Sequence, residues 1–329
     1  MKILVTGGAG YIGSHTAVVL LQNGHEVVIA DNLSKTDGKS IEAIREITHS
    51  DVVFEQVDAT DGIAVNKLFN KFQFDGVIHF AGFKAVAESV QKPLEYYYNN
   101  VVSTIQLCKA CHDHQVEKLV FSSSATVYGD NEVPFREDME LKPRANPYGE
   151  TKAISEQILR DYAKANPSAI VTILRYFNPI GAHESGLIGD AQTGIPNNLM
   201  PYIVKVAKGE LPKLNVYGND YPTPDGTGVR DYIHIMDLAE GHVVALNRNK
   251  PGSEVFNLGT GKGTSVLELV KMFERINEIQ IPYEICDRRP GDIASYFAAT
   301  EKAAKGLEWR SKLGLEQMVR DAWTFEKRR

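Results

Sequence analysis

A tyrosine and a lysine stand one helical turn apart in the segment NPYGETK, which covers residues 146–152. A proline that opens a helical pattern predicts that the helix begins there, and residues four apart then share one face. A free phenol has a pKa of about 10, too high for a base at neutral pH, but a nearby ammonium group favours the phenolate. Tyr148 could therefore accept a proton from a substrate hydroxyl beside Lys152, although such pairs are also common on solvent-exposed helices.

A glycine-rich segment, LVTGGAGYIGSH, carries Gly7, Gly10 and Gly13 between an apolar run and a helical pattern. Glycine allows a tight turn and lets backbone N–H groups approach a pyrophosphate, which the positive end of a helix also favours. The same glycines could serve only to turn the chain. An acidic residue at the end of the next apolar run, Asp31, favours the dinucleotide reading.

Asp31 can accept hydrogen bonds from ribose hydroxyls and repel a 2′-phosphate, so the sequence predicts NAD rather than NADP. Asp58 ends the third apolar run and could contact the adenine edge, while FAGFKA, residues 80–85, ends the fourth run beside the same crevice. NAD would take a hydride from the carbon whose hydroxyl gives its proton to Tyr148, and its positive ring would also favour the phenolate. Lys152 could hold the nicotinamide ribose, and Ser124 in FSSSATVYG could share the substrate proton.

These residues need a framework that brings strand ends together. Through the first half of the chain, continuous Val, Ile, Leu and Phe runs alternate with helical patterns, as in parallel strands that are buried on both faces. The predicted fold class is α/β: a doubly wound, Rossmann-type, mostly parallel sheet with a smaller, loop-rich α/β substrate-binding domain. We expect residues 1–177 to form the NAD-binding domain, and residues 178–329 mainly the second domain, with segments at about 230–260 returning to the first.

The composition is that of an ordinary globular protein. The chain has 329 residues, of which 43% are hydrophobic and 24% charged, and its formal net charge is −6. This charge gives no support for nucleic-acid or membrane binding through a basic surface. We find no leader pattern and no apolar run long enough to span a membrane, so we expect a cytoplasmic protein.

The three cysteines are too few for a disulfide framework. Cys108 and Cys111 form a C-x-x-C motif with His112 and His114 close by, which leaves zinc binding or redox chemistry open. The surrounding pattern is helical and no second cysteine pair follows, so we favour two small apolar residues on a packed helix.

Several blocks of the chain together resemble a known family. TGGAGYIG, SSSATVYG and YGETK resemble the extended short-chain dehydrogenase/reductase family. Longer blocks resemble its UDP-glucose 4-epimerase (UDP-galactose 4-epimerase) branch: HFAGFKAVAESVQKPLEYYYNN, RYFNPIGAH, GIPNNLMPY, GNDYPTPDGTGVRDYIHIMDLAEGH and RRPGD. The resemblance runs from Met1 to the last helix. It implies a tightly bound NAD that oxidises carbon 4 of the hexose to a ketone and reduces it again on the opposite face, interconverting UDP-galactose and UDP-glucose in galactose metabolism.

The resemblance also assigns roles to individual residues. It makes Tyr148 the base and then the acid, with Lys152 tuning it and Ser124 helping to move the proton. The implied cofactor contacts lie in the glycine turn, at the strand ends and beside the tyrosine helix: Gly7, Gly10, Tyr11, Ile12, Gly13, Asp31, Asn32, Ser34, Lys35, Asp58, Ala59, Phe80, Ala81, Gly82, Lys84, Asn99, Ser122, Ser124, Tyr148, Lys152 and Phe177. The implied substrate contacts recognise uracil, ribose, diphosphate and sugar: Lys84, Ser124, Tyr148, Asn178, Asn198, Leu199, Val216, Tyr217, Arg230, Arg289, Asp292 and Tyr296.

Tyr296 occupies the position that the resemblance assigns to the pocket for the 2-substituent of the hexose. A bulky ring there suggests that UDP-glucose and UDP-galactose are used, and N-acetylated sugars poorly. The family habit implies a homodimer, for which the helices at residues 93–111 and 148–163 are candidates. Residues 33–50 are individual to this chain, which weakens the assignment of Ser34 and Lys35.

Other functions remain open at this point. A sugar-nucleotide 4,6-dehydratase would need carboxylate groups where the chain reads Ala125-Thr126-Val127, and a decarboxylase of the same family is likewise disfavoured. Epimerisation of another UDP-sugar, such as an N-acetylhexosamine, a uronate or a pentose, fits the same residues. A non-catalytic NAD-binding sensor would be free to lose the Tyr148–Lys152 pair, which this chain retains.

Overall fold

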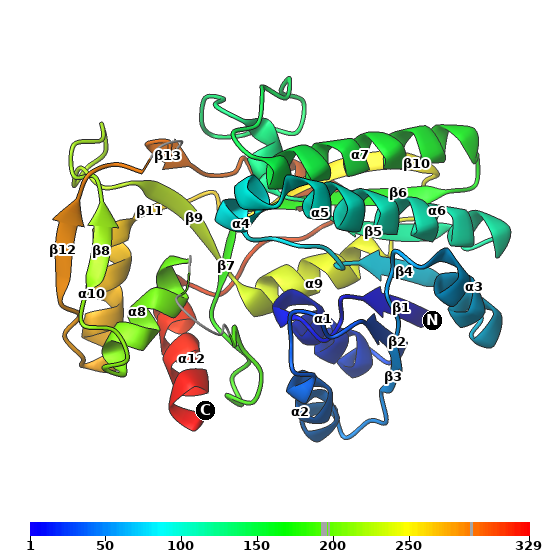
Figure 1. The fold of residues 1–329 in the computed structure, drawn as a ribbon, viewed down its shortest axis with the longest axis horizontal. Coiled ribbons are helices and arrows are strands. Elements are labelled where there is room, and N and C mark those ends of the chain that lie inside the picture. Colours follow the sequence, from blue (N-terminus) through cyan, green and yellow to red (C-terminus); the bar gives the residue numbers. More distant parts are fainter. Residues whose placement is uncertain (192–195, 197, 290–291) are drawn as a thin grey trace.

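The structure is a computed structural model that describes residues 1–191, 196, 198–289 and 292–329. It consists of a large α/β unit and a smaller, loop-rich unit beyond one end of its sheet (Figure 1). Two of the sequence blocks fall partly outside the described residues: positions 194, 195 and 197 of GIPNNLMPY, and positions 290 and 291 of RRPGD.

The large unit is built on a parallel sheet, as the buried apolar runs predict. Among the described residues it has seven strands in the order β10-β6-β5-β4-β1-β2-β3, and every neighbouring pair is parallel. The strands are β1 (Lys2–Thr6), β2 (Glu26–Asp31), β3 (Val53–Gln56), β4 (Gly76–His79), β5 (Lys118–Ser122), β6 (Ile170–Tyr176) and β10 (Gly252–Leu258). The predicted α/β fold class is therefore confirmed.

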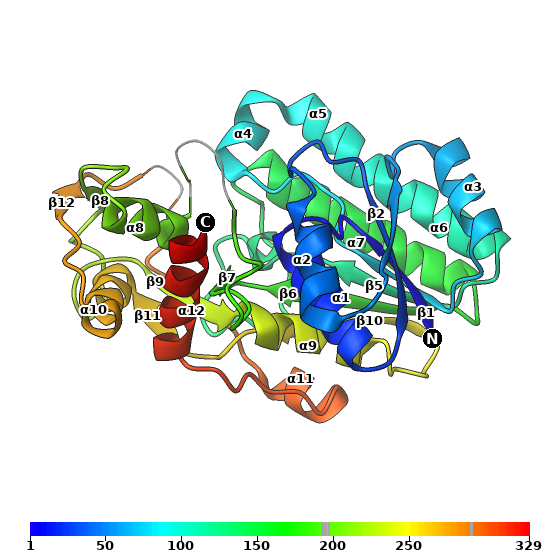
Figure 2. The same cartoon turned by 90° about the horizontal axis from the view of Figure 1, so that it is seen from below.

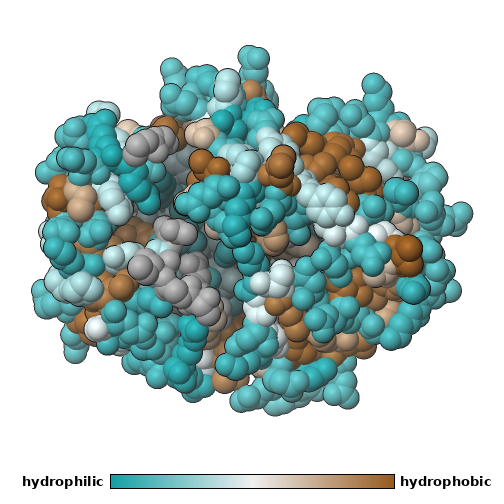
Figure 3. Space-filling view, in the orientation of Figure 1, coloured by the Kyte–Doolittle hydropathy of each residue, from teal (hydrophilic) through white to brown (hydrophobic). Residues whose placement is uncertain are grey.

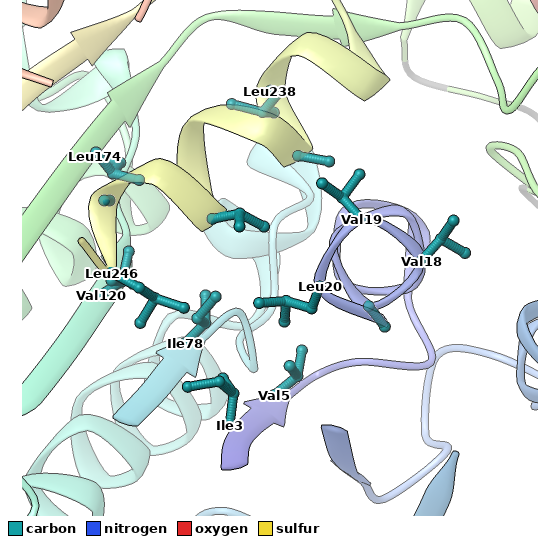
Figure 4. Close-up of a cluster of buried hydrophobic side chains, with 14 of the residues drawn as sticks. Ile3, Val5, Val18, Val19, Leu20, Ile78, Val120, Leu174, Leu238 and Leu246 are labelled. Carbon is teal, nitrogen blue, oxygen red and sulfur yellow. The ribbon is translucent and has the colours of Figure 1, made fainter. Parts of the chain in front are cut away.

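Helices cover both faces of this sheet (Figure 2). One face packs against α1 (Tyr11–Gln22), α2 (Lys39–Thr48), α9 (Ile235–Ala245) and α11 (Glu301–Gly306), and the other against α3 (Gly62–Lys71), α6 (Ser103–Asp113) and α7 (Pro147–Ala165). Successive residues of β1 explain why its run is continuously apolar. Ile3 and Val5 pack under α1 and α9 (Figure 4), whereas Leu4 joins the cluster under α3 and α6.

Two late segments belong to the large unit by their contacts. β10 pairs with β6 along its whole length, and α9 packs against α1. These elements lie at residues 235–258, close to the region expected to return to the first domain. The division into an NAD-binding and a substrate-binding domain stays a prediction.

The smaller unit combines short strands and helices around its own core. Within the described part of the chain, a mixed sheet has the order β11-β9-β13 with β7 also on β9, and β12 pairs with β8. Its elements are β7 (Asn178–Ile180), α8 (Leu199–Ala207), β8 (Leu214–Tyr217), β9 (Val229–His234), β11 (Gly263–Ser265), α10 (Val266–Asn277), β12 (Tyr283–Cys286), β13 (Ser295–Tyr296) and α12 (Leu315–Arg328). Because β9 runs directly into α9, this unit is tied to the large sheet.

The C-x-x-C motif is part of the core. Cys108 and Cys111 are buried on α6, where burial raises the pKa of the Cys108 thiol to about 12. His112 hydrogen-bonds the side chain of Asn166 at 2.6 Å, so it is engaged away from the thiols. The expectation of two small residues on a packed helix is confirmed. No helix in the described ranges is long and apolar enough to cross a membrane.

Candidate active site

The helix that carries the tyrosine and the lysine begins where the proline predicts. Asn146 caps α7 by accepting a hydrogen bond from the Gly149 N–H at 2.9 Å, and Pro147 occupies the first turn. Tyr148 and Lys152 are 9% and 5% exposed, so the pair is not on a solvent-exposed helix face. The alternative that Tyr148 and Lys152 form an ordinary pair on a solvent-exposed helix is therefore wrong. Helix α7 turns this face towards the ends of β4, β5 and β6.

Lys152 is anchored at the end of β5. Its ammonium group donates to the Ser122 carbonyl at 2.6 Å and lies 4.8 Å from the centre of the Phe121 ring. Burial lowers the pKa of Lys152 to about 8, and the negative charge of Glu156 opposes this decrease. Lys152 is thus still mostly protonated at neutral pH.

Burial has the opposite effect on Tyr148. It raises the pKa of the phenol above its usual value, and the Ser124 side chain lowers it only in part. The chain's own groups therefore do not produce the lowered pKa that the Tyr–Lys spacing suggests. Ser124 itself is held in place, since its hydroxyl accepts hydrogen bonds from the N–H and the hydroxyl of Thr126 at 3.2 and 3.0 Å.

The glycine turn lies at the carboxyl end of β1, where the order of the strands reverses between β1 and β4. Gly7 has a φ of +70°, and a Cβ atom on it would lie 2.6 Å from the Ala81 nitrogen. A Cβ atom on Gly13 would lie 2.4 Å from the Gly7 carbonyl oxygen. A side chain at Gly7 or Gly13 would therefore clash with neighbouring backbone atoms, so the close turn at the start of α1 requires glycine at both positions. Gly10 and Ile12 complete the turn, and the Tyr11 hydroxyl donates to the Gly181 carbonyl at 2.8 Å, which ties the turn to the smaller unit.

Asp31 meets this turn, and Asp58 lies beside it at the next strand end. The Asp31 carboxylate accepts hydrogen bonds from the backbone N–H groups of Ala9 and Leu33 at 3.2 and 2.9 Å. Burial raises its pKa. The Asn32 amide donates to Asp58 at 3.0 Å, so the ends of β2 and β3 are joined. Ala59 directly follows Asp58 in the chain.

Ser34 and Lys35, the other positions assigned to the adenosine, are also near these strand ends. The Ser34 N–H donates to the side chain of Asn32 at 3.0 Å. Lys35 forms an ion pair with Glu88 at 3.1 Å and lies 4.8 Å from the centre of the Phe83 ring. Lys35 is therefore held towards α4 (Val86–Gln91), a partner that the sequence motif does not reveal.

The end of β4 is organised by Asn100, a residue that the motifs did not single out. Asn99 and Asn100 lie in a π-helical turn (Tyr98–Val102) that follows α5 (Pro93–Tyr97). The Asn100 side chain accepts from the Phe83 N–H at 2.8 Å and donates to the Thr151 hydroxyl at 3.0 Å. It thus links the segment of Phe80, Ala81, Gly82 and Lys84 to the helix of the Tyr–Lys pair. An irregular turn inside a helix often marks a functional site, but the sequence gives no simple sign of one.

Two arginines of the smaller unit converge on one carboxylate. Arg289 forms an ion pair with Asp292 at 2.9 Å and lies 4.8 Å from the centre of the Tyr217 ring. Arg230 lies 3.9 Å from the same carboxylate, and its guanidinium also donates to the Val229 and Ile293 carbonyls at 2.8 and 3.0 Å. The structure therefore brings together the residues that the resemblance assigns to the diphosphate and the ribose.

Tyr296 connects this arginine group with the tyrosine helix. It pairs with Arg230 in the register of β13 and β9. Its ring packs edge-on against Phe177 and Phe135, with centroids 5.1 Å apart in both pairs. A charge on Tyr148 would raise the pKa of the Tyr296 phenol, which places the two side chains near each other. Phe135 was missed because it lies in a polar loop without any motif.

The remaining substrate positions are more scattered. Asn178 begins β7, while Asn198 and Leu199 stand at the start of α8. Val216 is buried in the core of the smaller unit, so only its backbone is available to a ligand. Their expected contacts with the substrate stay predictions.

Comparison with known proteins relates this arrangement to sugar-nucleotide enzymes. The family model described as GDP-mannose 4,6 dehydratase matches residues 4–322. A UDP-glucose 4-epimerase of Bacillus subtilis (strain 168) is 55% identical over 329 residues, which cover 99% of this chain and 97% of that protein. A UDP-glucose 4-epimerase of Pasteurella multocida (strain Pm70) is 54% identical and covers 100% and 98%.

Solved structures agree over the same length. The UDP-glucose 4-epimerase of Bifidobacterium longum, in complex with NAD+ and UDP, has a TM-score of 0.96 and 48% identity. It covers 100% of this chain, which spans 98% of that one. The UDP-glucose 4-epimerase of Stenotrophomonas maltophila, with bound NAD and formylated UDP-arabinopyranose, has a TM-score of 0.97 and 46% identity at the same coverage.

Proposed function

This chain belongs to the UDP-glucose 4-epimerase family, and on that premise we propose that it interconverts UDP-galactose and UDP-glucose in galactose metabolism. The observation that carries the proposal is the buried Tyr148–Lys152 face. It lies between a glycine turn suited to a dinucleotide and the strand that presents Arg230 and Tyr296. A 4,6-dehydratase is disfavoured because residues 125–127, in the short 3-10 helix Ala125–Tyr128, carry no carboxylate.

The residues at the carboxyl ends of β1 and β2 fit NAD. The bare backbone at Gly7 and Gly13 would hold the pyrophosphate at the start of α1, where the helix dipole favours negative charge. Asp31 would accept hydrogen bonds from the adenosine ribose and exclude a 2′-phosphate. When bound, NAD would accept the hydride from carbon 4 of the hexose and return it to the opposite face.

Tyr148 would carry the proton in both directions. It takes a proton from the carbon-4 hydroxyl as the ketone forms and returns it to the ketone oxygen as the alcohol forms again, with no net redox change. Because burial raises the pKa of Tyr148, the phenolate needs positive charge close by. Lys152 provides one positive charge from its fixed position on the Ser122 carbonyl, the oxidised nicotinamide ring would add a second, and Ser124 shares the proton.

The arginines would hold the diphosphate. Arg230 is already fixed by two backbone carbonyls, so its remaining N–H groups can face phosphate oxygens with little loss of side-chain entropy. Arg289 is half exposed and lies across the Tyr217 ring, where it can close on a bound nucleotide. Asp292, which binds both arginines, would be free to meet the UDP ribose once phosphate takes its place.

Tyr296 would select the sugar. Phe177 and Phe135 brace its ring, so the ring cannot swing away easily to admit a larger 2-substituent. We therefore expect UDP-glucose and UDP-galactose as substrates and UDP-N-acetylhexosamines as poor ones.

The proposal includes a homodimer. Val90, Leu94 and Tyr98 are 60%, 81% and 62% exposed on α4, α5 and the following turn, and Ile105 on α6 is also exposed. Apolar side chains gather over α5 and α6 on the face shown in Figure 3. A second copy that packs this face on its own equivalent would bury them. Leu94→Glu should yield a monomer in sedimentation analysis, and a wild-type chain that sediments as a monomer would contradict the proposal.

The proposal also includes a cytoplasmic location. The free cysteines, two of them buried thiols, fit a reducing compartment such as the cytoplasm.

The experiment that tests the function is the incubation of the purified protein with UDP-galactose, without added NAD. NMR of the sugar protons should show UDP-glucose appearing, which would establish 4-epimerisation and a cofactor that came with the protein. No conversion after NAD is added would refute the proposal. UDP-N-acetylglucosamine, UDP-glucuronate and UDP-xylose would then be tested as alternative substrates.

A further inference from the structure

The helix face of the Tyr–Lys pair continues one turn further, to Glu156. Tyr148, Lys152 and Glu156 are four residues apart on α7, and all three are buried. Their partners are three consecutive serines at the end of β5, of which Ser122 is the last residue of the strand. Tyr148 faces Ser124, Lys152 donates to the Ser122 carbonyl, and Glu156 accepts from the Ser123 hydroxyl at 2.6 Å.

The Glu156 carboxylate is fully used in this arrangement. One oxygen accepts from Ser123 and from Arg175 Nε at 2.8 Å, and the other accepts from Arg175 Nη2 at 2.6 Å and from Arg160 at 2.7 Å. Glu156 is 0% exposed and Arg175 1%. A buried ion pair is costly to desolvate and contributes little to stability compared with apolar side chains of the same volume, so a role in holding neighbouring groups is the better account of it.

Arg175 is fixed from the far side. Its guanidinium lies 4.6 Å from the centre of the Tyr128 ring, and the Tyr128 hydroxyl donates to Asn257 on β10 at 2.6 Å. Arg175 itself belongs to β6, which pairs with both β5 and β10. The carboxylate therefore connects α7 directly to β6 and to the serine segment at the end of β5, and Arg175 and Tyr128 extend this connection to β10.

We propose that Glu156 is a positioning residue for the epimerase reaction, which holds the serine segment 122–124 against the helix turns of Tyr148 and Lys152. This inference rests on the proposed function. Without Glu156, the middle serine loses its partner on the helix, and both the Ser122 carbonyl that anchors Lys152 and the Ser124 hydroxyl that faces Tyr148 become less constrained. Loss of about 1 Å of precision at reacting groups can lower a rate by about 100-fold.

Glu156 has a second effect, on the charge of Lys152. Among the described residues, the groups that face Lys152 from other elements are uncharged: His79 on β4, whose pKa is lowered to about 3, and the Phe121 ring and Ser122 on β5. Tyr176 on β6, also uncharged, hydrogen-bonds Ser122. On α7 itself, Tyr148 has a raised pKa, and Glu156 carries the negative charge that raises the pKa of Lys152. Removal of that charge should make Lys152 lose its proton at lower pH.

Two variants separate the two effects. Ser123→Ala removes the hydroxyl but keeps the carboxylate charge, so kcat should fall about tenfold or more with no displacement of the pH profile. Glu156→Gln also removes the charge. Its kcat should fall at least as far, and the alkaline limb of its pH profile should move to lower pH by about 0.5 unit or more, about threefold in the dissociation constant. The KM for UDP-galactose should change less than about threefold in both, because the nucleotide contacts lie elsewhere.

A matched control uses another buried hydrogen-bonded pair that includes a carboxylate side chain. His234 and Asp321 are both buried, and their side chains meet at 3.0 Å between β9 and α12. Asp321→Asn should lower the melting temperature while leaving the alkaline limb unchanged. If Glu156→Gln does not fold, the double variant Glu156→Leu with Arg175→Met replaces both charges by apolar groups and should fold with the same loss of kcat.

The outcomes are distinguishable. Wild-type kcat and an unmoved alkaline limb in Glu156→Gln, or wild-type kcat in the double variant, would overturn the positioning role. A shift of the limb in Asp321→Asn as large as that in Glu156→Gln would also overturn it, since the shift would then report general destabilisation. A wild-type protein that does not epimerise UDP-galactose would instead refute the proposed function.

Discussion

Replacement of Tyr148 by phenylalanine is the most direct test of the proton-transfer role. The variant keeps the ring, which is buried at the start of α7, and removes only the hydroxyl. We expect conversion of UDP-galactose to fall by about 100- to 10,000-fold in kcat, the usual contribution of a positioned acid–base group. At about 1.4 kcal/mol per factor of ten, this corresponds to about 3 to 6 kcal/mol of lost transition-state stabilisation.

The same substitution should hardly affect stability. The Tyr148 hydroxyl interacts with Ser124, whose hydroxyl keeps its two hydrogen bonds from Thr126 in the variant. No buried group is therefore orphaned among these three residues, and the cost is that of one ordinary hydrogen bond, about 1 kcal/mol. The loss of transition-state stabilisation should thus be several times larger than the loss in the free energy of unfolding. A residue with a purely structural role would not show this difference.

The assay follows the sugar protons of UDP-galactose by NMR, at equal protein concentration, next to thermal unfolding of both proteins. Ser124→Ala is the matched comparison, because it removes the partner of the phenol and keeps the phenol itself; we expect a smaller loss than in Tyr148→Phe. A kcat of Tyr148→Phe within tenfold of wild type, in a protein that is equally stable, would refute the reasoning.

The other predictions concern the cofactor, the diphosphate and the sugar. Gly13→Ala places a Cβ atom 2.4 Å from the Gly7 carbonyl oxygen, so the purified variant should release less NAD on denaturation than wild type; Gly10→Ala, with 3.3 Å to the same oxygen, is the milder control, and equal NAD content in all three would contradict us. Arg230→Lys should raise the KM for UDP-galactose about tenfold with a smaller change in kcat, since one ammonium group cannot serve both the backbone carbonyls and the phosphate; steady-state kinetics decide, and an unchanged KM speaks against the diphosphate role. Tyr296→Cys should gain turnover of UDP-N-acetylglucosamine and lose a few degrees of melting temperature, and the idea fails if wild type already uses that sugar as well as UDP-glucose.

Much of the framework was predictable because its signals are local. The continuous apolar run of β1 reports two-sided burial within five residues, and the spacing of Gly7 and Gly13 reports a tight turn, in which Gly7 has a φ of +70° and Gly13 lies against the Gly7 carbonyl oxygen. The start of α7 at Pro147 follows from proline geometry alone. In each case the signal is a residue type or a run of a few residues, so a short pattern carries the information.

The parts that the sequence did not predict depend on contacts between distant segments. Phe135 lies in a loop that the motifs pass over, yet its ring braces Tyr296, which is far along the chain. Asn100 resembles its neighbour Asn99 in the sequence, and only the π-helical turn sets its amide between Phe83 and Thr151. Such roles come from the packing of whole elements, which a short pattern does not contain.

The electrostatics of the Tyr–Lys pair is the clearest case of this kind. From the sequence, the ammonium group of Lys152 is expected to draw down the pKa of Tyr148. In the folded chain both groups are buried, and burial disfavours each charged form: the pKa of the phenol rises and that of the ammonium falls to about 8. The two shifts oppose the phenolate–ammonium pair that catalysis needs. The chain counters one of them with Glu156, which keeps Lys152 protonated, and leaves Tyr148 as the group whose proton moves. A site in which Tyr148 were already ionised would hold its base ready but would return the proton to the ketone oxygen less easily. An epimerase must perform both transfers with one group, so a phenol that stays neutral until the positive charge of oxidised NAD would join that of Lys152 serves the reaction in both directions.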